Sequence, residues 1–147
     1  MISKKMKYAL KALIQIANKT EDYAKASDIA ERGHIPKKFL EQILLELKKG
    51  HIISSKQGNV GGYYFVKKTK DVTLADVYRL IDGPIALVQC ASKNFYEKCD
   101  DCPNEDTCSI RLALLEVRDE TLRILEKRNI EDLAKESAPS VSGNWSI

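Results

Sequence analysis

The sequence predicts a mainly α-helical protein with one small β-hairpin, arranged as a winged helix-turn-helix domain followed by a long C-terminal helix. Three features support this fold class. Two short helical segments flank a tight turn at residues 34–35, and two short β-prone segments joined by a glycine-rich turn follow at once. A long apolar stripe then begins near residue 109, directly after a 19-residue window that contains all four cysteines.

The first helix is expected over residues 3–18, because apolar residues recur there at spacings of three and four. A second, short helix is expected over residues 25–33, with Gly33 as its stop. After a tight turn, Pro36 suits the first turn of a third helix, which Gly50 is expected to end. Such a helix pair, whose second member carries long polar side chains, is the helix-turn-helix pattern.

A β-hairpin is expected directly after this helix pair. Residues 52–55 and 63–66 are its expected strands, and three glycines in residues 56–62 let the turn approach a phosphate or enter a narrow groove. Basic residues flank both strands, which favours a DNA-binding wing over an ordinary hairpin with a flexible tip. A further short helix is expected to begin with the N-cap pair Thr73 and Asp76.

The C-terminal region is dominated by an apolar stripe that runs from about residue 109 to residue 128. The stripe consists of Ile110, Leu114, Val117, Thr121, Ile124 and Leu125. It is long for a small chain, so it could pack against the first helix or against a second copy. The expected parts are a winged helix-turn-helix DNA-binding domain (1–82), a cysteine-rich sensor loop (83–108), a dimerisation helix (109–133) and a flexible tail (134–147).

Charge is distributed unevenly along the chain. Residues 1–70 carry 15 Lys or Arg and 6 Asp or Glu, a net charge of +9, whereas residues 71–147 carry 9 and 15, a net charge of −6. A basic half suits a polyanion and an acidic half suits self-association, although two differently solvated surfaces would give the same numbers. No apolar run approaches the roughly 18 residues that span a bilayer, so the protein is expected in the cytoplasm, with no membrane partner.

The four cysteines, Cys90, Cys99, Cys102 and Cys108, are separated by eight, two and five residues. In a reducing cytoplasm, such clustering favours metal or redox chemistry over structural disulfides. Four thiolates can hold an iron–sulfur cluster or a tetrahedral zinc ion. Only Cys99 and Cys102 form the C-x2-C pair that structural zinc sites use twice, which favours a cluster; zinc, a disulfide and unliganded thiols are the alternatives. Neighbouring acidic residues are expected to raise the thiol pKa values.

Several motifs occur together in the order of one known family. They are residues 35–44 (IPKKFLEQIL), Gly61-Gly62-Tyr63, residues 72–77 (VTLADV), the cysteine loop and the opening Lys7-Tyr8-Ala9-Leu10. Over roughly residues 1–130, this combination closely resembles the Rrf2 family of bacterial winged-helix regulators.

The resemblance implies a homodimer joined by the long C-terminal helix. It also implies, in some members, a 2Fe–2S or 4Fe–4S cluster beside that helix. Cluster-binding members carry three cysteines before or at the start of the helix, and the matching residues here are Cys90, Cys102 and Cys108.

The fourth cluster ligand varies among members of that family. One version uses a histidine and another an acidic residue of the partner's first helix; the matching positions here are Arg111 and Lys7. Neither can ligate iron in its usual charged state, so Cys99 is the expected fourth ligand. A ligand from the partner chain, with Cys99 free, is the alternative.

The expected partner is a double-stranded DNA operator, with the helix over residues 36–49 in its major groove. Lys38, Glu41 and Gln42 are the candidate base readers, because Glu can accept from cytosine, Gln can pair with adenine and Lys can reach guanine. The candidate phosphate contacts are Lys4, Lys5, Lys37 and Lys56. The candidate wing contacts with the minor groove, by the resemblance, are Gln57 and Asn59.

These features together predict a transcriptional regulator, expected to be a repressor, whose operator binding depends on the cluster or on the redox state of the cysteines. The alternative is a small iron–sulfur or zinc protein that serves as an electron carrier or interaction module with an acidic partner. No Ser/His/Asp triad, Gly-rich nucleotide loop or catalytic carboxylate pair is visible, so the sequence predicts neither an enzyme nor a small-molecule substrate.

Overall fold

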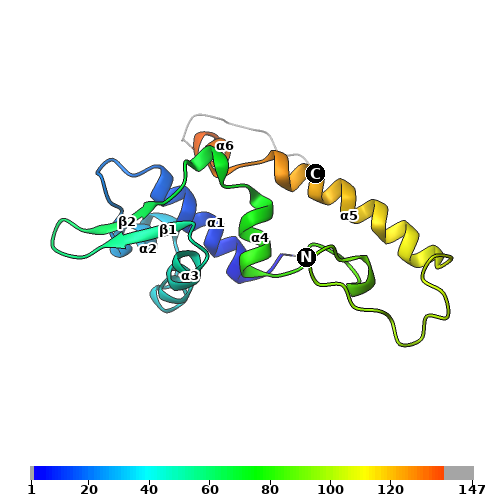
Figure 1. The fold of residues 1–147 in the computed structure, drawn as a ribbon. Helices are drawn as coiled ribbons and strands as arrows, with labels where there is room; N and C mark the ends of the chain where they lie inside the picture. The colour runs from blue at the N-terminus through cyan, green and yellow to red at the C-terminus, as the bar shows by residue number, and fades with distance from the viewer. Residues whose placement is uncertain (1, 138–147) are drawn as a thin grey trace.

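The computed structural model describes residues 2–137 (Figure 1). Its elements are α1 (Lys4–Ala17), α2 (Ala26–Gly33), α3 (Lys37–Lys49), β1 (Ile53–Lys56), β2 (Gly62–Phe65), η1 (Thr69–Asp71), α4 (Leu74–Ile81), η2 (Gln89–Ala91), α5 (Ser109–Lys127) and α6 (Ile130–Glu136). The predicted fold class, mainly helical with a two-stranded antiparallel hairpin, is confirmed. Most of the predicted flexible tail lies outside the described residues.

Helix α1 forms the centre of the molecule and packs against α2, α3, α4 and α6. Its buried face consists of Met6, Ala9, Ala12, Leu13 and Ile16. The two alanines let neighbouring helices approach closely, while the larger side chains fill the space between them. Ser3 caps the helix, because its Oγ accepts a hydrogen bond of 2.9 Å from the backbone N–H of Met6.

The turns that bound α3 differ from the sequence prediction in the residues that bend the chain. Gly33 stays helical, and a Cβ there would lie only 2.9 Å from Cδ1 of Ile35. His34 takes the left-handed conformation instead, with φ of 48°. Gly50 likewise has φ of −77° and packs under a side chain of α4, while His51 has φ of 55°. These glycines are thus required for close packing rather than for positive φ.

The hairpin pairs Ile53 with Phe65 and Lys56 with Gly62, so each strand begins and ends one residue from its predicted bounds. A third segment lies along the outer edge of β2. The backbone N–H of Ala24 donates to the carbonyl of Tyr63 at 2.9 Å, and the reciprocal bond measures 2.8 Å. The connection between α1 and α2 is therefore tied to the base of the wing.

Helix α4 begins with the predicted cap, since Thr73 and Asp76 form a reciprocal capping box. Its other end is tied to the start of α1. The carboxylate of Asp82 accepts hydrogen bonds from both the backbone N–H of Ser3, at 2.8 Å, and the Ser3 hydroxyl. Gly83, with φ of 90°, then turns the chain out of the helical body and toward the cysteines.

The single helix predicted over residues 109–133 is two helices, α5 and α6. Two backbone hydrogen bonds to the start of α4 fix the break between them. The N–H of Leu74 donates to the carbonyl of Arg128 at 2.9 Å, and the N–H of Ile130 donates to the carbonyl of Val72 at 3.0 Å. The chain is therefore pulled out of helical geometry where it crosses α4.

Helix α6 packs against α1, and Ile130 at its start is fully buried. The side-chain amide of Asn18 donates to the carbonyl of Ala134 at 3.3 Å. Residues 134–136 consequently belong to a docked helix, and the prediction that the tail begins at residue 134 is wrong. No helix among the described residues is long and apolar enough to cross a membrane.

Two leucines of α3 provide a matched test of this core. Leu47 is completely buried, whereas Leu45 is 52% exposed on the same helix. We expect Leu47→Ala to lower the free energy of unfolding by about 2–5 kcal/mol, because it leaves a cavity. Leu45→Ala should change it by about 0.5 kcal/mol or less. Urea unfolding followed by circular dichroism measures both, and similar losses for the two variants would contradict this packing.

Candidate DNA-binding face and cysteine site

The outward face of α3 carries the three residues predicted to read bases. Lys38, Glu41 and Gln42 are all exposed in the first half of the helix. The opposite face is buried, and it consists of Leu40, Ile43, Leu44 and Leu47. Burial of that face fixes the rotation of α3, so the three polar side chains point into solvent. Their contacts with bases stay a prediction.

Among the predicted phosphate contacts, Lys4 and Lys37 are exposed and near the N-termini of α1 and α3. Lys5 is different, because its ammonium lies 2.7 Å from the carboxylate of Glu46 and so links α1 to α3. Another contact was not predicted: the ammonium of Lys48 donates to the Ser55 hydroxyl at 2.6 Å. That bond holds the wing against the end of α3.

The tip of the wing is a tight turn from Gly58 to Gly61, closed by a hydrogen bond of 3.0 Å between the Gly61 N–H and the Gly58 carbonyl. A Cβ on Gly61 would overlap the backbone of Lys56, so a glycine is required there. The predicted wing residues Gln57 and Asn59 are exposed on this turn. The turn thereby projects their amide groups away from the domain.

The four cysteine sulfurs lie as two pairs. Cys99 lies beside Cys90, and Cys102 lies beside Cys108, so that in each pair the neighbouring thiol raises the pKa of Cys99 or Cys102. A turn connects the pairs, with 3.4 Å between the Cys102 N–H nitrogen and the Cys99 carbonyl oxygen. Cys90 is buried and the other three are partly buried. The loop thus brings together residues that span the whole 19-residue window.

The thiols of Cys99 and Cys102 are held in their neutral form. Hydrogen bonding with Cys90 and loss of solvation raise the pKa of Cys99 to about 11. Desolvation and the neighbouring Cys108 raise the pKa of Cys102. The direction of both pKa shifts agrees with the prediction, but Asp101 raises the pKa of Cys99 less than Cys90 does, and Glu105 raises the pKa of Cys102 less than Cys108 does. A bound cation is therefore needed to favour the thiolates.

Helix α5 holds the cysteine loop through two arginines that sequence analysis did not assign to this role. Arg111 Nε donates to the carbonyl of Cys90 at 3.0 Å, and Arg118, whose side chain is only 12% exposed, donates to the carbonyl of Ala91 at 2.6 Å. Within the loop, the Tyr96 hydroxyl donates to the Glu105 carboxylate at 2.5 Å, which raises the pKa of Tyr96. The loop and α5 therefore form one bonded unit.

Among residues 2–137, no group of three or more His, Cys, Asp or Glu side chains is arranged to hold a single metal ion. Four cysteine thiols within one loop are, however, the number and kind of donor that an iron–sulfur cluster takes. Lys7 is exposed on α1, and the Arg111 guanidinium is bound to a backbone carbonyl. The four cysteines consequently fit the donor set of an iron–sulfur cluster.

One face of α5 is left uncovered in the single chain. Leu122 is the only buried residue of this helix, while Ile110, Val117 and Ile124 of the predicted stripe are 68%, 45% and 54% exposed. A groove of about 250 Å³ lies beside them, lined mainly by Ile2, Tyr78, Ile85, Ala86, Leu87 and Leu125. The stripe was predicted to pack either against the first helix or against a second copy. Because α6 packs against α1 in place of α5, packing of the stripe against the first helix is wrong.

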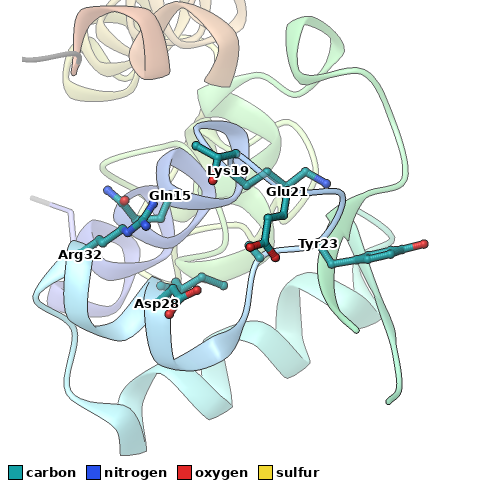
Figure 2. Close-up of a pocket in the computed structure, with 9 residues that line it drawn as sticks. Gln15, Lys19, Glu21, Tyr23, Asp28 and Arg32 are labelled. Atoms are coloured by element: carbon teal, nitrogen blue, oxygen red, sulfur yellow. The ribbon is translucent and has the colours of Figure 1, made fainter. Parts of the chain in front are cut away.

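A smaller recess lies between the end of α1 and α2 (Figure 2). Its charged side chains have both signs, Lys19 and Arg32 against Glu21 and Asp28. The volume is about 50 Å³, whereas small-molecule sites usually measure about 300–1,000 Å³. The recess therefore has room for a few water molecules.

The model of the Rrf2 family, described as iron-dependent transcriptional regulators, matches residues 2–136. The chain belongs to the Rrf2 family. An Rrf2-like HTH-type transcriptional regulator of Rhodobacter capsulatus is 41% identical over 144 residues, which cover 95% of this chain and 96% of the relative. The structure of CymR, the global cysteine regulator of Bacillus subtilis, aligns with a TM-score of 0.75 at 26% identity over 93% of this chain and 98% of CymR.

A second solved structure, IscR of T. potens, aligns with a TM-score of 0.72 and covers 97% of this chain and 93% of IscR. At 22% identity this likeness shows the fold alone. Family membership confirms the predicted class, a winged-helix DNA-binding transcriptional regulator and not an enzyme. The sequence pattern did not reveal three residues that hold elements in place. They are Asp82, which binds the start of α1, Lys48, which binds the wing, and Arg118, which binds the cysteine loop.

Proposed function

We propose that this Rrf2-family protein is a homodimeric, cytoplasmic repressor whose affinity for its operator is set by an iron–sulfur cluster on Cys90, Cys99, Cys102 and Cys108. The observation that carries the proposal is the pairing of the four sulfurs in a loop bonded to α5. The family description as iron-dependent regulators supports the choice of iron. No residue of the proposed site has a catalytic role.

The proposed DNA contact combines α3 with the wing. Lys38, Glu41 and Gln42 enter the major groove, since they are exposed on the one face of α3 that the core leaves free. Gln57 and Asn59 reach the adjacent minor groove from the wing tip. The candidate phosphate contacts remain Lys4, Lys5, Lys37 and Lys56, with Lys5 in exchange between Glu46 and DNA.

The proposed dimer contact is the uncovered stripe of α5. The stripe includes Ile110, Val117 and Ile124, and each of these side chains is about half exposed or more. An apolar groove continues beside the stripe. A second copy with the same stripe covers both faces at once in a two-fold contact. Such a dimer presents two α3 helices to two half-sites.

Cys90, Cys99, Cys102 and Cys108 would hold the proposed cluster through their four thiolates. When bound, the cluster supplies a redox-sensitive and oxidant-sensitive centre. The residues of this chain hold it and couple it to DNA: Arg111 and Arg118 bind the loop to α5, and α5 leads through the bonds at residues 128–130 into α6, which packs on α1. Ordering of the loop therefore changes the position of α5 relative to the DNA-binding face.

The base readers can be separated from the phosphate contacts by mutation. We expect Lys38→Ala and Gln42→Ala each to reduce the preference for operator over random DNA by about 1–3 kcal/mol. Lys4→Ala should weaken both kinds of DNA to a similar extent and flatten the salt dependence. Fluorescence anisotropy with operator and random duplexes at several salt concentrations measures this. Equal weakening of both duplexes by the Lys38 and Gln42 variants would show that these residues do not read bases.

The dimer is tested by two apolar-to-acidic changes on different sides of α5. Val117→Asp places a charge in the uncovered stripe, so we expect monomers at micromolar concentration and weakened operator binding. Leu112→Asp is the matched control, because Leu112 is 48% exposed and lies outside the stripe. Sedimentation velocity measures both. A monomeric wild-type protein, or equal loss with the two variants, would rule out this interface.

The cluster is tested by anaerobic assembly with ferrous iron and sulfide. We expect the wild type to become coloured and to change its operator affinity, and each of the four single Cys→Ser variants to lose the visible spectrum. Because ligation requires thiolates and the pKa of Cys99 is raised to about 11, assembly releases protons and weakens as pH falls. Thr107→Ser is a control within the same loop and should assemble normally.

Two outcomes of that experiment lead to different conclusions. If Cys99→Ser keeps a normal spectrum while the other three variants lose it, the fourth ligand lies elsewhere, as in a partner-chain arrangement. If the wild type stays colourless and binds zinc, the iron–sulfur assignment is wrong, and the protein is a regulator with a zinc-stabilised loop.

A further inference from the structure

A basic and aromatic surface lies on the side of the hairpin that faces away from α3. Tyr23, in the connection between α1 and α2, lies between the ammonium groups of Lys19 and Lys56, which are 5.7 Å and 5.3 Å from its ring centre. Tyr64 of β2 meets this ring edge-on, with 5.6 Å between the ring centres. Figure 2 shows Tyr23 pointing away from the small recess and toward the hairpin.

An open hollow of about 490 Å³ continues from these rings along β2 to the residues that follow it. Lys67 and Lys68 line the hollow and are exposed. We call the whole surface the outer wing surface, defined by Lys19, Tyr23, Lys56, Tyr64, Lys67 and Lys68. Within residues 2–137 none of its four lysines forms an ion pair with a carboxylate, and one acidic residue, Asp22, lines the hollow. The surface therefore carries four lysines against one carboxylate, a net positive charge.

We propose that the outer wing surface binds the phosphates of the DNA strand beyond the minor groove that the wing enters, and so extends the footprint past each operator half-site. This inference rests on the proposed docking of α3 and the wing. Across the domain the order is α3, β1, β2 and the outer wing surface, because α3 contacts β1 and the segment at Ala24 pairs with β2. Across B-DNA the matching order is major groove, backbone, minor groove and the next backbone.

Two further observations favour DNA as the occupant. Lys56 stands at the base of the wing tip, directly before Gln57, so the outer wing surface is continuous with the proposed minor-groove contact. The Tyr23 ring lies near two ammonium groups. One N–H of Lys19 donates to the Asp22 carbonyl, and an ammonium has two more N–H donors that can meet phosphate oxygens. Contacts of this kind add affinity without reading sequence.

The test uses the full chain and two duplexes that contain the same operator, obtained by selection from random DNA with the wild-type protein. The short duplex carries the operator alone, and the long duplex adds about one helical turn of random sequence on each side. We expect the wild type to bind the long duplex more tightly. The double variant Lys67→Ala/Lys68→Ala should lose that gain while it binds the short duplex as the wild type does.

The salt dependence gives a second readout. On the long duplex, the slope of log affinity against log salt should fall by about 1 for each lysine–phosphate contact removed. The control variant Lys93→Ala/Lys127→Ala removes the same charge away from the hairpin and should retain both the gain and the slope. A double variant that keeps the length-dependent gain would overturn the proposal and leave an acidic protein segment as the partner of this surface.

Equal weakening of the Lys67→Ala/Lys68→Ala variant on both duplexes would also overturn it, because the lysines would then lie inside the operator contact. Failure of the underlying DNA-docking proposal is distinguishable, since in that case the Lys38 and Gln42 variants would not change operator preference on either duplex.

Discussion

The close packing of α1 between α3 and α6 is the constraint on which the rest of the structure depends. The buried face of α1 is shared by α3 on one side and by α6 on the other (Figure 1). Polar contacts reinforce both sides, from Lys5 to Glu46 and from Asn18 to the Ala134 carbonyl. Because close-packed interiors transmit displacements and do not absorb them, a movement of α6 must reach α3 through α1. The predicted boundary between a DNA-binding domain and a separate C-terminal part therefore does not describe the mechanics of this chain.

The cysteine loop is connected to that core at two places. One connection runs through the arginines of α5 to α6, and the other through Gly83 and Asp82 to the cap of α1 at Ser3. Asp82 therefore contacts the first turn of the helix that carries Lys4 and Lys5. The state of the loop can thus bias both ends of the DNA-binding domain.

The sequence allowed the elements to be predicted where local chemistry decides them. The capping box at Thr73 and the amphipathic face of α3 follow from short spacings, and the structure contains both. The predictions failed where contacts distant in sequence decide. The break before α6 depends on backbone bonds to residues 72 and 74, which no periodicity near residue 128 can reveal.

The same distinction applies to the candidate site. The clustering of four cysteines was visible in the sequence, but their division into two sulfur pairs depends on how the loop folds back toward Cys90. The apolar stripe was visible as well, yet only the fold shows that α4 and η2 contact α5 and leave the stripe itself uncovered. Arg111, Arg118 and the buried Leu122 lie on one side of α5, with the stripe on another. The helix that binds the cysteine loop and the helix proposed to join two protomers are the same helix, so in the proposed dimer a rotation of α5 would also change the spacing of the two α3 helices.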